Sequence, residues 1–250
     1  MSERAKLYLL DVEGTTSPIS LVYEQLFPYA KKHLEPYLRA QVREPWIEDE
    51  LAADLALLAE ENAAEDKSAS APVLASPEEG ASWEGAVPEA AAYLGWLMEK
   101  DRKSTALKAL QGRVWRAGFE AGELVGTVFD DVPIALARWS REGRVAIYSS
   151  GSVEAQQLLF RHSSAGDLTP YISAYFDTRV GAKTAAASYR AIAAAMDVRA
   201  EEIVFISDVV RELDPAREAG CVTWLSVRDG NAPVADPHGH AVIASFNDAR

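Results

Sequence analysis

The stretch Lys6-Leu7-Tyr8-Leu9-Leu10-Asp11-Val12-Glu13-Gly14-Thr15-Thr16 decides the fold class of this chain. Its apolar part, 6–10, predicts a short buried strand. The strand runs into two carboxylates, Asp11 and Glu13, and then into Gly14, which lets the backbone turn sharply. Ligands of open α/β sheets bind beyond the carboxyl ends of strands. The stretch therefore predicts a sheet and a binding site at its edge.

Further apolar runs of the same character follow at 145–148, 203–206 and 222–227. Each is short, rich in β-branched or aromatic residues, and bounded by Gly, Asp or Ser. Helical patterns lie between them, including 153–161 and the Ala-rich 184–196. Strands that alternate with helices predict an α/β fold with a parallel sheet and helices on both faces.

The stretch from about 21 to 123 shows helical periodicity with almost no strand signal. We expect helices over 21–38, 48–61, 90–111 and 114–121, and a mobile surface loop over 65–82, where Ser, Ala, Pro and Glu predominate. These patterns predict two parts: an α/β core formed by 1–18 and 126–250, and an all-helical cap inserted between them at 19–125.

The composition limits the possible partners. Acidic residues outnumber basic ones 38 to 25, a net charge of -13, which argues against nucleic acid because phosphate backbones need clustered Lys and Arg. A small anionic substrate needs only a few local cations. The single cysteine, Cys221, lies in an apolar run, so we expect a reduced, buried thiol.

The sequence shows neither a signal-peptide pattern nor an apolar run of the ~20 residues that a membrane span needs. We therefore expect a cytoplasmic protein without a membrane partner. The sequence also lacks a long exposed heptad pattern or edge-strand signal, so we expect a monomer.

The first carboxylate pair offers two chemical roles. One of Asp11 and Glu13 can attack a phosphorus atom as a nucleophile, while the other protonates the leaving oxygen and then activates water. The structural alternative is that Asp11 caps a helix and Glu13 is solvated. The pair by itself does not separate these readings.

Residues Ser149-Ser150-Gly151-Ser152 follow the run 145–148 and open a predicted helix. Hydroxyls and free N–H groups at a helix start can cradle a phosphate, which makes Ser149 and Ser150 candidate substrate ligands. An ordinary helix cap is the alternative, because Ser is a preferred capping residue.

Lys183 stands at the start of a predicted helix, where the helix dipole favours anions. Its ammonium could neutralise a bound phosphate and an attacking carboxylate together. The alternative is a solvated lysine, which is what a single lysine in a sequence usually is.

Asp208 and Glu212 follow the run 203–206 and lie four residues apart, on one face of a helix that begins there. Mg²⁺ prefers one or two carboxylates together with phosphate and water oxygens, which Asp208 and Asp11 would supply. Glu212 could act through water or orient Lys183. The alternative is that acidic residues here stabilise a helix N-terminus.

Each motif alone is weak, but their order after successive strands is specific. Together they supply a nucleophile, an acid/base, a phosphate cradle, a cation and a metal ligand, which is a complete set for phosphoryl transfer.

These four motifs resemble those of the haloacid dehalogenase superfamily. Glu13 stands where most phosphatases of that superfamily carry Asp, and this variant is similar to the enolase-phosphatases of methionine salvage. Longer strings resemble them too: Ile147 to Gln156, Asp101 to Lys108, Leu110-Gln111-Gly112, Phe176-Asp177-Thr178 and Ser188-Tyr189. Asp208 is followed by Glu212, whereas the wider superfamily commonly has Asp at that place, which puts direct metal contact by Glu212 in doubt.

The resemblance implies a haloacid-dehalogenase-like core and a two-step reaction. The enzyme would enolise a diketo methylthiopentyl phosphate and then remove its phosphate to give an acireductone. One Mg²⁺ per subunit would be held by Asp11, Asp208 and the position of Glu13, Asp11 and Glu13 would be catalytic, and Ser149, Ser150 and Lys183 would bind substrate.

Three other activities fit parts of the pattern. A phosphatase for another small ester would share the four motifs. A dehalogenase would use the Asp11 nucleophile without a metal and would leave Asp208 and Glu212 without a purpose. A binding protein on the same fold would not need the intact set of catalytic groups.

Overall fold

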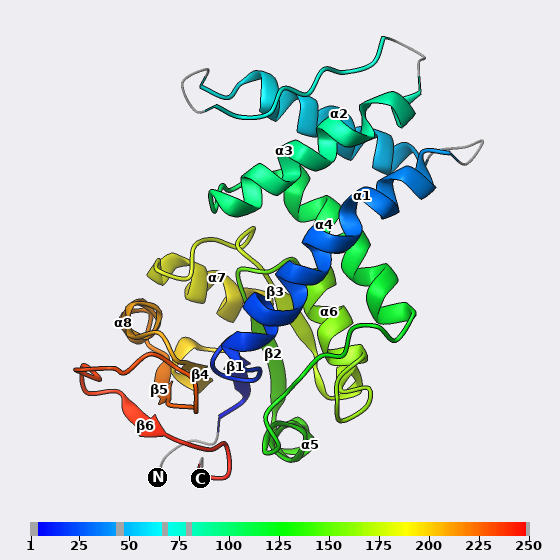
Figure 1. Cartoon of the computed structure of the whole chain (residues 1–250). Coiled ribbons are helices and arrows are strands. Elements are labelled where there is room, and N and C mark those ends of the chain that lie inside the picture. Colours follow the sequence, from blue (N-terminus) through cyan, green and yellow to red (C-terminus); the bar gives the residue numbers. More distant parts are fainter. Residues whose placement is uncertain (1–4, 44–47, 67–69, 79–81, 249–250) are drawn as a thin grey trace. The chain divides into compact units, whose positions relative to one another are not determined.

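The computed structural model describes residues 5–43, 48–66, 70–78 and 82–248 (Figure 1). The chain divides into two compact units, one of Met1–Gln25 with Ala121–Arg250 and the other of Leu26–Glu120. The helical insertion that we expect at 19–125 is somewhat wider than the second unit. We describe each unit by itself.

The first unit is built on a six-stranded parallel sheet in the order β3-β2-β1-β4-β5-β6. The predicted strands are confirmed as β1 (Leu7–Leu10), β2 (Arg144–Tyr148), β4 (Ile203–Ser207) and β5 (Val222–Ser226). The sequence pattern missed β3 (Ala174–Phe176) and β6 (Ala241–Ile243). Both have only three residues, and neither is fully buried, so the apolar signal of a central strand is lacking.

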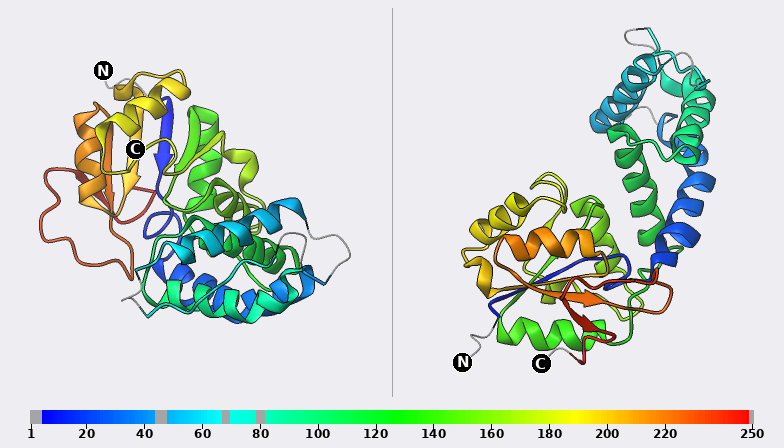
Figure 2. Two further views of the ribbon diagram at one scale, coloured as in Figure 1. Left: turned by 90° about the horizontal axis from the view of Figure 1, so that it is seen from above. Right: turned by 90° about the vertical axis from the view of Figure 1, so that its left-hand side faces the viewer.

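Helices cover both faces of this sheet, as the alternation of elements predicts. They are α5 (Val132–Glu142), α6 (Val153–Arg161), α7 (Ala186–Ala195) and α8 (Val210–Glu218), and Figure 2 shows α5 and α8 on opposite faces. Alternate residues of β1 serve the two faces. Leu7 and Leu9 join the buried cluster of α7 and α8, whereas Tyr8 stacks on Trp139 of α5 with ring centroids 4.5 Å apart.

The second unit is all-helical in its described residues. Its helices α1 (Phe27–Gln41), α2 (Asp49–Ala63), α3 (Val87–Glu99) and α4 (Thr105–Glu120) enclose one apolar core. A π-helix, η1 (Leu21–Leu26), leads into α1, and a short 3-10 turn, η3 (Trp83–Ala86), precedes α3. Two further 3-10 turns, η4 (Thr169–Tyr171) and η5 (Ala200–Glu202), belong to the first unit. The described part of the expected loop, 70–78, is irregular; 67–69 and 79–81 lie outside the described residues.

The expected helix over 90–111 is wrong, because α3 and α4 are separated by 100–104. Asp101 has a left-handed backbone (φ 48°), which ends α3. Ser104 then caps α4 by accepting from the backbone N–H of Leu107 at 2.8 Å, and Glu61 of α2 accepts from that of Thr105 at 3.0 Å. The helix boundary is thus fixed in part by a residue far away in sequence.

Cys221 is a free, buried thiol, as expected, and burial raises its pKa to about 12. None of the helices in the described ranges combines the length and the apolar character that crossing a membrane requires.

Candidate active site

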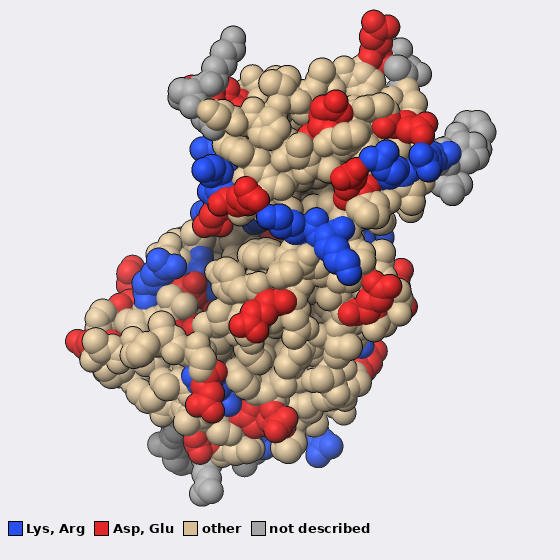
Figure 3. Space-filling model, viewed as in Figure 1, with Lys and Arg blue, Asp and Glu red and all other residues tan. Residues whose placement is uncertain are grey.

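Strand register brings the candidate residues to one edge of the sheet. Leu10 at the end of β1 pairs with Ile147 of β2 and with Ile206 of β4, and the backbone N–H of Asp11 donates to Ile206 O at 3.0 Å. The residues that follow these strand ends therefore start side by side. Asp11 and Lys183 are only 2% and 9% exposed, so they contribute little to the charged surface that Figure 3 colours.

Lys183 forms the centre of a buried ion cluster. Its Nζ lies 2.6 Å from Asp11 Oδ1 and 2.6 Å from Glu212 Oε2. Burial alone would lower the pKa of Lys183, but the two carboxylates outweigh it and the net shift is upward, so the ammonium stays charged. Lys183 is thus no solvated lysine, and Glu212 contacts it directly, which is compatible with one of the two roles that the sequence left open for this residue.

The loop that carries Lys183 is held by three hydroxyl groups. Tyr148 donates to Gly181 O at 2.9 Å, Ser188 to Ala182 O at 2.7 Å, and the Tyr189 hydroxyl lies 2.7 Å from Lys183 O. Lys183 precedes α7, and three successive carbonyls of its loop thus contact buried hydroxyls. The string Ser188-Tyr189 singled out above is therefore part of the support for the lysine.

Asp11 is fixed at both carboxylate oxygens. Oδ1 accepts from the backbone N–H of Val12 at 2.8 Å as well as from Lys183, and Oδ2 lies 2.9 Å from the hydroxyl of Ser207. Ser207 Oγ also lies 3.2 Å from Glu212 Oε2. No sequence motif points to Ser207, but its hydroxyl links the two carboxylates that contact Lys183.

Glu13 is less buried than Asp11 and lies near the Ser149 hydroxyl, which favours its charged form. Burial raises its pKa, and the negative charge of Asp11 raises it further. A carboxyl group with a raised pKa can hold and release a proton nearer to neutral pH than an ordinary glutamate can. The arrangement therefore places an ion-paired carboxylate, Asp11, near a carboxyl group whose raised pKa suits proton transfer, Glu13.

Asp208 lies over the backbone of Gly14. Gly14 has a left-handed backbone (φ +67°), and a Cβ at this position would overlap the Asp208 carboxylate. Burial and the charge of Asp11 raise the pKa of Asp208 to about 7. The sharp turn predicted at Gly14 thus also makes room for an acidic side chain.

The donor chemistry of this edge fits a divalent cation. Within the described ranges, no three His, Cys, Asp or Glu side chains are grouped to hold a metal by themselves. Burial and the charge of Asp11 nevertheless disfavour the ionised form of Asp208, and an added cation would relieve this. Mg²⁺ is commonly held by one or two carboxylates with waters and phosphate oxygens, so two carboxylates suffice.

The serines of the loop 149–152 differ in burial and in contacts. Ser149 is buried beside Glu13, and its Oγ accepts from the backbone N–H of Gly151 at 3.1 Å. Ser150 is exposed. Ser152 is the N-cap of α6, accepting from the N–H of Ala155 at 3.2 Å, so the capping alternative holds for this residue.

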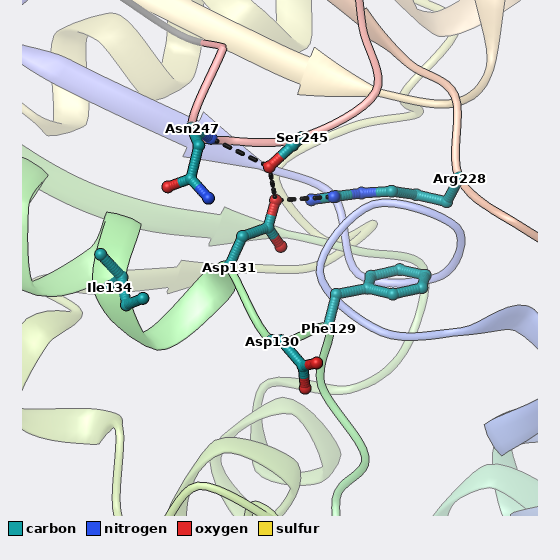
Figure 4. Close-up of a pocket in the computed structure, with 7 residues that line it drawn as sticks. All are labelled: Phe129, Asp130, Asp131, Ile134, Arg228, Ser245 and Asn247. Atoms are coloured by element: carbon teal, nitrogen blue, oxygen red, sulfur yellow. Dashed lines mark hydrogen bonds and ion pairs between the residues drawn. The ribbon is translucent and has the colours of Figure 1, made fainter.

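Two residues of the C-terminal segment also contact the loop after Asp11. Asn231 Nδ2 donates to Gly14 O at 2.9 Å, and the Arg228 guanidinium donates to Thr15 O at 3.3 Å. Figure 4 shows the anchor of Arg228, an ion pair with Asp131 at 2.7 Å beside a surface pocket. Asn231 belongs to none of the four sequence motifs, and its contact with Gly14 joins residues 217 positions apart.

Comparison with known proteins agrees with this geometry. Residues 5–220 match the model of haloacid dehalogenase-like hydrolases. The chain is 48% identical to the enolase-phosphatase E1 of Synechococcus elongatus over 90% of both chains. It is 41% identical to that of Danio rerio, over 98% of this chain and 94% of the relative.

Solved structures give the same result. The UTR4 protein of Saccharomyces cerevisiae is 33% identical and has a TM-score of 0.75, with 98% of this chain and all of that one covered. A predicted phosphoglycolate phosphatase from Haemophilus somnus, 15% identical with a TM-score of 0.56, shares the fold alone. This chain is a phosphatase of the haloacid dehalogenase-like hydrolases and belongs to the enolase-phosphatase family.

Proposed function

We propose that the enzyme enolises a diketo methylthiopentyl phosphate and then removes its phosphate, giving an acireductone for methionine salvage. The observation that carries this proposal is the buried cluster in which Lys183 contacts Asp11, with Glu13 and Asp208 beside it. The enolase-phosphatase names of relatives that match nearly the whole chain support the choice of substrate.

Asp11 acts as the nucleophile in the second step. One of its oxygens forms a bond to phosphorus as the bond from phosphorus to the ester oxygen breaks, and Glu13 gives its proton to that oxygen. Glu13 then takes a proton from water, whose oxygen attacks phosphorus and releases Asp11. Lys183 and Ser149 neutralise and bind the phosphate, with Ser150 as a further ligand from the same loop.

Asp11 and Asp208, with the backbone carbonyl at Glu13, would hold one Mg²⁺ per subunit. When bound, the ion supplies positive charge that polarises a carbonyl and offsets phosphate charge. Glu212 contributes indirectly, because its carboxylate contacts Lys183.

Glu13 also serves as the carbon-acid base in the first step. Its side chain reaches one methylene further than Asp would, and burial raises its pKa toward the range that suits proton abstraction. Glu13→Gln should stop enolisation. If enolisation survives in this variant while dephosphorylation is lost, the base is another residue.

The helical unit, within the range 19–125, acts as a cap that selects the substrate. We also propose that the enzyme is a cytoplasmic monomer. Sedimentation velocity at micromolar concentration tests the oligomeric state, since a dimer would sediment clearly faster.

The activity is tested by mixing the purified protein with Mg²⁺ and the diketo methylthiopentyl phosphate, then following the ultraviolet spectrum and free phosphate together. We expect an enol absorbance that rises and then falls as phosphate appears. Phosphate release from other esters, without an enol signal or turnover of this substrate, would retain the phosphatase and refute the methionine-salvage substrate.

A further inference from the structure

The segment that follows β5 holds the backbone of the loop after Asp11. Ser226 Oγ lies 3.4 Å from Gly14 O, Asn231 Nδ2 donates to the same oxygen at 2.9 Å, and Arg228 donates to Thr15 O. Arg228 is itself fixed between the rings of Phe129 and Phe246, at 4.7 Å and 4.6 Å from their centroids. The segment therefore presents Asn231 to Gly14 from an anchored backbone.

The orientation of the Asn231 amide is settled by its neighbours. Its Nδ2 faces two carbonyl oxygens, Gly14 O at 2.9 Å and Ser226 O at 3.4 Å, and carbonyls can only accept. Oδ1 must therefore point the other way. Among the described residues it is a buried oxygen with no hydrogen-bond partner. A buried acceptor without a donor is costly, so its retention calls for a donor from outside the polypeptide.

Oδ1 points to the side of Gly14 where Asp208 lies. The place that a Cβ of Gly14 would take is 3.0 Å from Asn231 Oδ1 and overlaps the Asp208 carboxylate. The Asp208 carboxylate thus fills the place that a side chain at Gly14 would need, and Asn231 Oδ1 lies at the edge of the same place. As a ligand of the ion Asp208 would be ionised, and a carboxylate only accepts, so it could not then donate to Asn231.

We propose that Asn231 is a positioning residue of the magnesium site. Its Nδ2 fixes the carbonyl of Gly14, and its Oδ1 accepts a hydrogen bond from a water of the ion held by Asp208 and Asp11. Mg²⁺ usually keeps several of its waters, and each of them is a donor. Partners of this kind orient the ligands and commonly contribute about tenfold or more to metal affinity. The inference rests on the proposed magnesium site.

Thermal unfolding at increasing Mg²⁺, without substrate, tests the proposal on wild-type protein and Asn231→Ala. We expect Asn231→Ala to need at least roughly tenfold more Mg²⁺ than the wild type for the same rise in Tm. Asn247→Ala is the matched control, because Asn247 is an exposed asparagine of the same C-terminal segment, and its response should equal that of the wild type. Asn231→Asp keeps an acceptor oxygen and should respond at Mg²⁺ concentrations closer to wild type than Asn231→Ala does.

Turnover supplies the second readout. In Asn231→Ala the Mg²⁺ concentration for half-maximal phosphate release should rise, whereas the substrate KM at saturating Mg²⁺ should stay near the wild-type value. A lower starting Tm with an unchanged Mg²⁺ requirement would show a merely structural role and overturn the proposal, leaving the proposed function intact. A wild-type protein whose Tm and phosphate release do not respond to Mg²⁺ would instead contradict the magnesium site itself.

Discussion

Replacing Lys183 by Met should destabilise the folded protein strongly, and more so at high pH. Lys183 Nζ contacts both Asp11 Oδ1 and Glu212 Oε2 at 2.6 Å in a buried position. Met keeps much of the side-chain length but leaves two buried carboxylates without their cation. Breaking such a buried pair from one side typically costs about 3–5 kcal/mol, and we expect a loss in this range at about pH 8.

The pH dependence follows from the carboxyl groups that remain. Burial and the charge of Asp11 already raise the pKa of Glu212 and Asp208 above their ordinary values, the latter to about 7, and loss of the ammonium raises them further. Because these folded-state values exceed the unfolded ones, protonation favours the folded state, and this stability is lost as pH rises through them. The difference between variant and wild type should therefore shrink as the pH is lowered from about 8 to about 5.

Urea denaturation followed by circular dichroism measures this effect, with Lys6→Met as the matched control. Lys6 also lies 2.7 Å from a carboxylate, that of Glu202, but its side chain is 64% exposed. The ammonium of this pair is solvated, and Arg199 Nη2 stays 3.0 Å from Glu202 Oε1 when Lys6 is replaced, so the control should lose less stability than Lys183→Met does. If Lys183→Met costs no more than Lys6→Met at about pH 8, or if its cost does not change with pH, the reasoning about the buried cluster is refuted.

Three further changes test other parts of the site. Gly14→Ala should lower the free energy of unfolding by at least about 1–2 kcal/mol in urea denaturation, because a residue with a Cβ pays for a left-handed backbone, and it should displace Asp208 and so raise the Mg²⁺ requirement for phosphate release. An unchanged Mg²⁺ requirement would contradict the packing of Asp208 over Gly14. Asp208→Asn should abolish Mg²⁺-dependent phosphate release yet stabilise the metal-free protein by about 1 kcal/mol at pH 8, because a half-buried acid with a folded pKa of about 7 opposes folding when ionised. A less stable variant would show that burial and the charge of Asp11 do not raise the pKa of Asp208 in this way. Ser152→Ala should cost about 1 kcal/mol through the lost cap of α6 and leave the substrate KM unchanged; a raised KM with unaltered stability would instead make Ser152 a phosphate ligand.

The strands that build the site could be predicted because their signal is local. The run before Asp11 is apolar and short, and every residue of β1 is buried between β2 and β4. The polar residues at the ends of β1, β2 and β4 are visible in the sequence for the same reason. Parallel register then brings them to one edge of the sheet without further information.

Other features depend on contacts that a local pattern does not contain. The break between α3 and α4 is fixed by Asp101, Ser104 and the distant Glu61, whereas the composition there is compatible with one long helix. Asn231 lies in a segment without regular structure, and only the folded chain brings it to Gly14. Ser207 is an ordinary buried strand residue until its hydroxyl is seen between Asp11 and Glu212.

The central claim is that Asp11 attacks the phosphorus atom, and chemical capture of a phosphorylated side chain tests it most directly. Wild-type enzyme is acid-quenched during turnover with Mg²⁺, and the acyl phosphate is reduced and located by peptide mass spectrometry. We expect the modification at Asp11, and we expect Asp11→Asn to show neither the modification nor phosphate release. Modification of another residue, or phosphate release by Asp11→Asn at the wild-type rate, would contradict the account.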